Sequence, residues 1–113
     1  MLYEVRNYHY DPSKFDAYAK WSKGEVNTFL KENLDIVGIW YYNGCPPEFG
    51  GADPTPSPHG APNVTWIIRW ESMEHRKQQM QEFRANEEWR RIWSTHPDPD
   101  AYLHMQVTFA QEI

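Results

Sequence analysis

Five histidines supply the side chains best suited to acid–base or metal chemistry, and they are scattered along the chain at His9, His59, His75, His96 and His104. No two of them have the i, i+4 helical spacing or the one-residue strand spacing that directs several imidazoles at one metal ion. We therefore predict no metal site and no bound cofactor. If the protein instead held haem, His75 at the start of a predicted helix could be its axial ligand, but a solvent-exposed histidine is the simpler interpretation of this residue.

His9 and Asn7 alternate on a predicted strand with the aromatic residue Tyr3. Because strand side chains alternate between the two faces of a sheet, these three share one face. We expect that face to point into the space between the sheet and the helices. There His9 could act as a general base, while Asn7 or Tyr42 could hold a carbonyl or phenolate oxygen. The predicted ligand-binding walls of this site are Tyr3, Trp40, Tyr42 and Trp66. The alternative interpretation is that these rings only fill the core.

The composition excludes several classes of function. A net charge of -5 and a pI near 5.4 do not suit nucleic-acid binding, which usually uses a basic surface. The mean hydropathy of -0.85 and the lack of a long apolar run do not suit a membrane protein. The only cysteine, Cys45, cannot form an internal disulfide. With no secretory signal at the N-terminus, we expect a cytoplasmic protein.

Hydrophobic periodicity predicts six elements in the order β-α-β-β-α-β. The expected strands cover residues 2–9, 35–43, 63–71 and 101–110, and they alternate apolar and polar side chains. A helix is expected over 14–33, weakened in the middle by Gly24, and a second helix begins after the capping residue Ser72 and is broken at Asn86. This order predicts one α+β, ferredoxin-like domain over residues 1–113 with a four-stranded antiparallel sheet.

Residues 45–62 read CPPEFGGADPTPSPHGAP, which excludes a helix or a central strand. A loop of this length is unusual and often acts as a lid or a binding loop. The alternative is a solvated excursion without a role at the site.

The predicted strands have two different faces. One is apolar and should lie under the helices: Tyr3, Val5, Trp40, Trp66, Ile68, Leu103, Met105 and Val107. The other mixes charged and apolar side chains: Glu4, Arg6, Ile39, Tyr41, Ile67, Arg69, His104, Gln106 and Thr108. Exposed apolar patches usually mark contacts, so we predict that a second copy covers the mixed face. Within that homodimer the charges of Glu4, Arg6 and Arg69 should be paired.

Several short motifs resemble NIPSNAP-like proteins. These are YEVRNY at residues 3–8, Gly38-Ile39-Trp40, WIIRWESMEHR at residues 66–76 and ANEEW at residues 85–89. The resemblance implies a dimeric α+β barrel in which two four-stranded sheets face each other with helices outside. The wider barrel group includes cofactor-independent monooxygenases, isomerases, dehydratases and haem enzymes. The sequence departs from the NIPSNAP pattern at Trp66, where histidine is frequent, and in the longer loop 45–62.

These observations lead to one functional prediction and two alternatives. The prediction is a homodimer that binds a small organic molecule. If it is catalytic, we expect a cofactor-independent isomerase, dehydratase or monooxygenase acting on an aromatic or polyketide-like substrate. The first alternative is a non-catalytic interaction or regulatory module with its aromatic surplus at protein contacts. The second is a haem or metal protein.

Overall fold

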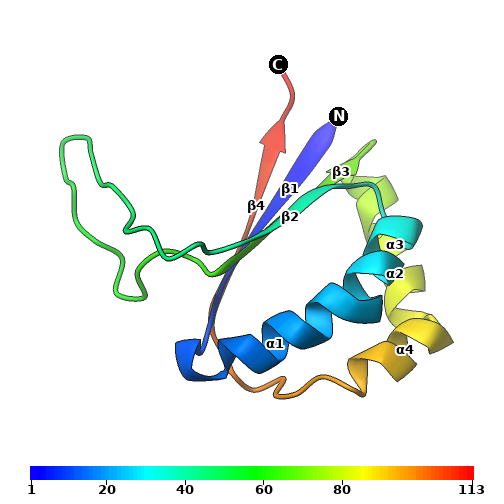
Figure 1. Ribbon diagram of the computed structural model, residues 1–113. Coiled ribbons are helices and arrows are strands. Elements are labelled where there is room, and N and C mark those ends of the chain that lie inside the picture. Colours follow the sequence, from blue (N-terminus) through cyan, green and yellow to red (C-terminus); the bar gives the residue numbers. More distant parts are fainter.

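The computed structural model describes residues 1–113. It consists of a four-stranded antiparallel sheet with all helices on one face. The strands are β1 (Leu2–Tyr10), β2 (Ile36–Tyr41), β3 (Val64–Trp70) and β4 (Tyr102–Gln111). Their order across the sheet is β2-β3-β1-β4, so the first and last strands of the chain are neighbours. Figure 1 shows the opposite face of the sheet bare. The predicted ferredoxin-like fold is confirmed.

The first helical region is interrupted where Gly24 was expected to weaken it. It consists of a short 3-10 turn, η1 (Pro12–Lys14), followed by α1 (Phe15–Trp21), the π-helical segment η2 (Ser22–Val26) and α2 (Asn27–Asn33). Gly24 has φ -78° and ψ -129°, which is not helical. Ser22 before this break, and Val26 and Asn27 after it, all face the sheet side.

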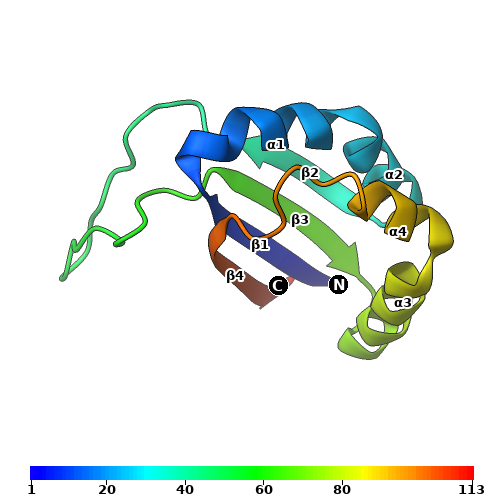
Figure 2. The ribbon, with the colours of Figure 1, turned by 90° about the horizontal axis from the view of Figure 1, so that it is seen from below.

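The second helical region is two helices with separate caps. Ser72 begins α3 (Met73–Ala85), where its hydroxyl accepts the His75 backbone N–H at 3.1 Å. Asn86 begins α4 (Glu87–Trp93), where its side-chain oxygen accepts the Trp89 N–H at 3.0 Å. The Ser72 cap and the break at Asn86 agree with the sequence prediction, and each side chain satisfies a backbone donor at a helix start. Figure 2 shows α1 and α2 along the β2 edge of the sheet, α4 and α3 following toward the other side, and β4 at the far edge.

The segment between β2 and β3 has no regular structure and extends away from the sheet (Figure 1). Asn63 anchors its end to β1, because its side chain accepts the Tyr10 N–H at 2.9 Å and donates to the Tyr10 carbonyl at 2.7 Å. Residues 46–60 are exposed throughout. The loop therefore contributes little to the core.

The facing of β1 differs from the prediction. Glu4 is fully buried under the helices and pairs with Ile68, while Tyr8 is buried opposite Val64. Paired residues of antiparallel strands point to the same face. The prediction of Glu4 and Arg6 on the barrel face is therefore wrong, and so is that of Tyr3 and Val5 on the helix side. The physical reason is an ion cluster that makes a buried Glu4 tolerable.

Two β-bulges place side chains of the edge strands on a different face of the sheet from the one predicted. The register of β2 shifts between Ile36 and Gly38, so that Trp40 pairs with Thr65 on the bare face. Ile39 and Tyr41 consequently lie on the helix side and not on the mixed face as predicted. A second shift near His9 leaves Leu103 unpaired and 55% exposed, whereas it was predicted under the helices. Each bulge inserts one residue and inverts the alternation beyond it.

The core under the helices has two parts. The first surrounds Ile68 and Trp70 with Val26, Leu30, Leu34, Met80 and Ile92. The second joins Tyr8, Tyr10, Tyr18, Val64 and Ala101. Between them remains the space that forms the candidate site. No helix of the protein has the length and apolar character required to cross a bilayer.

Candidate ligand-binding site

A pocket of about 440 Å³ lies between the helices and the sheet. Its floor is formed by two levels of the sheet, with Tyr41, Val64 and Tyr8 on one level and Ile39, Trp66 and Arg6 on the next. Its walls come from all the helices, and they include Tyr18, Trp21, Val26, Leu30, Met80, Phe83, Trp89 and Trp93. Apolar walls of this extent with a few polar groups are typical of small-molecule sites.

A buried ion cluster borders the pocket floor. The Glu4 carboxylate is fully buried and lies 2.6 Å from both Arg6 Nη1 and Arg76 Nε. Arg76 Nη2 and Trp70 Nε1 donate further hydrogen bonds to it at 3.3 Å and 2.9 Å. Burial alone would raise the pKa of Glu4, but the bonds from Arg76 and Arg6 outweigh it, and the pKa lies below its ordinary value. Glu4 is therefore ionised and fixes the direction of Arg6.

Arg6 directs the rest of its guanidinium toward the pocket. Its Nε donates to the Tyr8 hydroxyl oxygen at 2.6 Å, and its Nη1 binds Glu4, whereas Nη2 has no hydrogen-bond partner within the chain. The group lies 5.1 Å from the Trp66 ring centroid, within reach of a cation–π contact. Burial raises the pKa of Tyr8, although the Arg6 charge opposes this, so the phenol keeps its proton. Tyr8 and Arg6 thus form a pair of donors at the floor.

A second group of hydrogen-bonded polar side chains lies beside the π-helical segment. The Tyr41 hydroxyl accepts a bond from Asn27 Nδ2 at 2.9 Å and pairs with the Ser22 hydroxyl. Ser22 is buried, and these three residues all line the pocket. The break at Gly24 positions Asn27 for this contact, which links the helix interruption to the pocket wall.

His96 is buried behind the wall, and its hydrogen bonds determine its tautomer. Its Nδ1 accepts the Asp98 backbone N–H at 3.0 Å, so Nε2 carries the proton and donates to the Tyr102 hydroxyl at 2.8 Å. Desolvation lowers the pKa of His96, although Asp98 opposes this effect. Burial also raises the pKa of Tyr102, which lines the pocket and keeps its own proton to donate.

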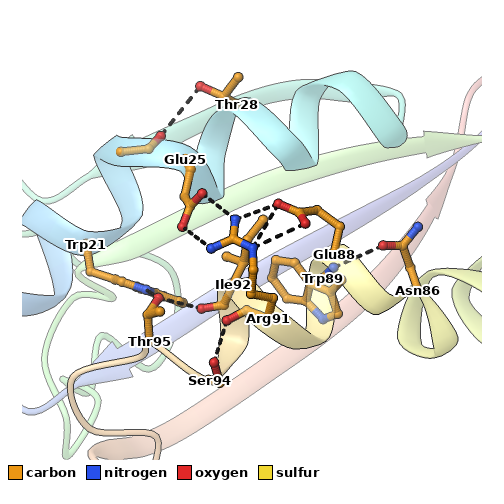
Figure 3. Close-up of polar contacts among 11 residues, drawn as sticks. Trp21, Glu25, Thr28, Asn86, Glu88, Trp89, Arg91, Ile92, Ser94 and Thr95 are labelled. Atoms are coloured by element: carbon orange, nitrogen blue, oxygen red, sulfur yellow. Dashed lines mark hydrogen bonds and ion pairs between the residues drawn. The ribbon is translucent and has the colours of Figure 1, made fainter.

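An Arg91 clamp joins the helices that enclose the pocket (Figure 3). The guanidinium lies 2.6 Å from Glu25 of η2 and also binds Glu88 within α4. Beside it, Trp21 Nε1 donates to the Thr95 hydroxyl at 2.8 Å. Since Trp21 lines the pocket, these contacts hold the two helical regions over one cavity. The Arg91 side chain is half exposed, so these ion pairs position the helices but add little to the stability of the fold.

The structure brings only part of the predicted site together. Trp66 lines the pocket. Tyr3, Asn7, His9 and Trp40 point to the bare face, because the facing of β1 and the last part of β2 is the reverse of that predicted. Tyr42 lies just beyond β2 and is 44% exposed. The placement of these five in a helix-side pocket is wrong, and their catalytic or binding roles stay untested.

The bare face holds the other predicted interface residues. Arg69, His104 and Gln106 lie there as expected, with Arg69 Nε bonded to Asp35 at 2.9 Å. His9 pairs with His104 across the strands, and the loop adds His59, with ring centroids 5.4 to 5.6 Å apart. His9 Nε2 lies 3.1 Å from the Gly60 carbonyl oxygen. No group of three or more His, Cys, Asp or Glu side chains is arranged to hold a metal ion.

Sequence reasoning missed the polar residues of the pocket, namely Arg6, Tyr8, Ser22, Asn27, Tyr41, Arg84 and Tyr102. A signal was present for β1, where Leu2, Tyr8 and Tyr10 share a face with Glu4 and Arg6. That face becomes plausible as a buried one only if a distant partner neutralises Glu4. Arg76, which does so, lies 72 residues further along the chain.

Comparison with known proteins identifies the fold. No family model matches the chain, and no curated protein is significantly similar in sequence. Among solved structures, an uncharacterised NIPSNAP-domain protein from Burkholderia xenovorans aligns with a TM-score of 0.72 at 18% identity, covering 100% of this chain and 95% of that one. A NIPSNAP family protein from Agrobacterium tumefaciens aligns with a TM-score of 0.74 at 12% identity, covering 99% and 85%. The chain has the fold of NIPSNAP-domain proteins, as the resemblance of its motifs predicted.

Proposed function

We propose that the protein binds a small organic molecule in the pocket between its helices and its sheet. The observation that carries this proposal is the pocket of about 440 Å³, in which 16 of the 21 lining residues are hydrophobic. Small-molecule sites usually have volumes of about 300–1,000 Å³ and a small number of oriented polar groups. The Arg6 and Tyr8 donors supply such groups at the floor of an aromatic cavity.

The pocket favours binding over acid–base catalysis. Its lining contains tyrosines and arginines but no carboxylate and no imidazole. A cofactor-independent isomerase or dehydratase needs a base near the substrate proton. His96 does not supply one, because its two ring nitrogens are engaged by Tyr102 and the Asp98 N–H. The same lining offers no axial imidazole for haem.

We further propose that the working form is a homodimer formed through the bare face of the sheet. The centre of this face is apolar, with Val5 opposite Ile67 and Trp40 49% exposed. A second copy would cover this face by two-fold symmetry, which supports this occupant over an unrelated partner. The lone cysteine Cys45 suits the cytoplasmic location that we propose.

The binding proposal is tested with N-phenylnaphthylamine, a neutral dye whose fluorescence rises in a dry environment. We expect saturable binding of one dye per chain, with energy transfer from the tryptophans that line the pocket. Linear, unsaturable fluorescence would contradict the proposal.

Two variants locate the bound dye. Leu30→Trp adds an indole to a buried position of the pocket wall and should abolish saturable binding. Val37→Trp adds the same group at a position that is 50% exposed and outside the pocket, and it should leave binding unchanged. Because overpacking costs about 1–3 kcal/mol, circular dichroism must first show that Leu30→Trp is folded. Equal binding by both variants would place the dye elsewhere.

A further inference from the structure

We infer that the ligand is an amphipathic anion, with an aromatic or aliphatic body and a carboxylate that binds the Arg6 guanidinium. This inference rests on the proposed binding function and specifies the class of ligand. A carboxylate carries its charge on two oxygens, and a guanidinium N–H forms a charge-assisted hydrogen bond with either of them. Two oxygens of one group could receive bonds from Arg6 Nη2 and from the Tyr8 hydroxyl.

The charge of the buried cluster supports an anion. One carboxylate, Glu4, faces two guanidiniums, those of Arg6 and Arg76, at 2.6 Å each. The cluster therefore holds one positive charge without an internal counter-ion. Arg6 and Arg76 are only 13% and 18% exposed, so water neutralises this charge poorly. A ligand carboxylate entering the pocket would complete the pairing.

The charge of the residues that line the pocket also supports an anionic ligand. It contains the basic residues Arg6 and Arg84 and no acidic residue, although the whole chain carries a net charge of -5. The Arg84 side chain makes no hydrogen bond or ion pair within the chain and lies exposed at the pocket. A positive site in an acidic protein attracts anions selectively, because the surrounding surface repels them.

The hydroxyl groups of the pocket also favour an oxygen-bearing ligand. Tyr8 receives a bond from Arg6, and Tyr102 receives one from His96, so both retain an O–H to donate. Buried donors without partners are costly, and an acceptor-rich group would satisfy them. A cationic ligand would instead meet two guanidiniums and several O–H dipoles. The pocket therefore discriminates by charge as well as by shape.

The test compares naphthoate with naphthamide, two probes of nearly equal size that differ in charge. Their dissociation constants are measured by isothermal titration calorimetry with the wild-type protein at neutral pH. We expect naphthoate to bind about tenfold or more tightly, as for one charge-assisted hydrogen bond. Equal affinities, or tighter binding of naphthamide, would overturn the inference and leave the neutral-dye result standing. Failure of both probes to bind would also overturn it.

Variants of Arg6 and Arg84 test which residue causes the preference for naphthoate over naphthamide. Arg6→Gln should abolish the naphthoate advantage while retaining naphthamide binding, and Arg6→Lys should restore part of it because the charge remains. Arg84→Gln keeps the ion cluster intact and should reduce the advantage without removing it. A full advantage in Arg6→Gln would refute the assignment. If Arg6→Gln does not fold, an unchanged advantage in both Arg6→Lys and Arg84→Gln would refute it instead.

Discussion

Arg76 Nε of α3 lies 2.6 Å from Oε1 of Glu4, the third residue of β1, and joins this helix to an inner strand of the sheet across 72 residues of sequence. Arg6 binds the other carboxylate oxygen of Glu4. The same carboxylate thus fixes the helix–sheet interface and orients the cation that faces the pocket. The stability of the fold and the chemistry of the site depend on one buried residue.

Replacing this carboxylate should be costly. Glu4→Gln leaves two guanidiniums close together without a counter-charge, and breaking a buried ion pair in this way costs about 3–5 kcal/mol. We expect a loss of this size in urea unfolding at pH 7. Glu32→Gln, on the exposed side of α2, is the matched control and should change stability little. A loss below about 1 kcal/mol for Glu4→Gln would show that the cluster does not stabilise the fold.

The pH dependence of stability should show the contribution of His96. Its folded-state pKa lies below its ordinary value of 6.5, so the unfolded chain takes up a proton first as the pH falls. The free energy of unfolding should therefore decrease below about pH 6.5, by up to about 1.4 kcal/mol per pH unit. His96→Gln should flatten this decrease, while His59→Gln in the exposed loop should not. An identical slope in wild type and His96→Gln would contradict the buried neutral imidazole.

A second loss of stability is expected at lower pH. Because the pKa of Glu4 is below its ordinary value of 4.5, its contribution is complete above that pH and is lost as the pH falls through the folded-state value. In Glu4→Gln this acidic limb should be smaller than in the wild type. The free energy of unfolding of both proteins would be measured by chemical denaturation at pH 5 and at pH 3. An equal loss of stability in the two proteins between these pH values would argue against an ionised Glu4.

The homodimer proposal predicts sensitivity at the bare face. Ile67→Glu introduces a charge opposite Val5 at the centre of that face, and Arg69→Glu reverses a charge beside Asp35. Both should shift the protein to a monomer in sedimentation experiments at low micromolar concentration. Gln81→Glu adds a charge on the outer side of α3 and should not. An intact dimer in Ile67→Glu would mean that another surface forms the contact.

The long loop should be dispensable for folding. Residues 46–60 are exposed, and the segment is anchored mainly through Asn63, which lies outside this range. Replacing 46–60 with a short turn should leave the thermal midpoint within a few degrees of the wild type. A large decrease would reveal packing of the loop, for example by His59 against His9 and His104.

The sequence predicts the fold well because helix caps, turn residues and periodicity are local. Ser72, Asn86 and Gly24 act where the sequence indicated, since each affects its own backbone. The site was predicted poorly for two non-local reasons. The bulge after Ile36 inverts the facing of Trp40, and a bulge leaves little trace in composition. The buried side of β1 depends on Arg76, which no local pattern connects to Glu4.

The most direct measurement of the central claim is a titration with naphthoate followed through the six indole N–H signals of the nitrogen-15 spectrum. Trp21, Trp66, Trp89 and Trp93 line the pocket, whereas Trp40 lies on the bare face. A ligand between the helices and the sheet should shift the four pocket signals together with one dissociation constant and leave Trp40 unchanged. A saturable shift confined to Trp40, or no shift of the pocket signals at millimolar ligand, would contradict the helix-side site.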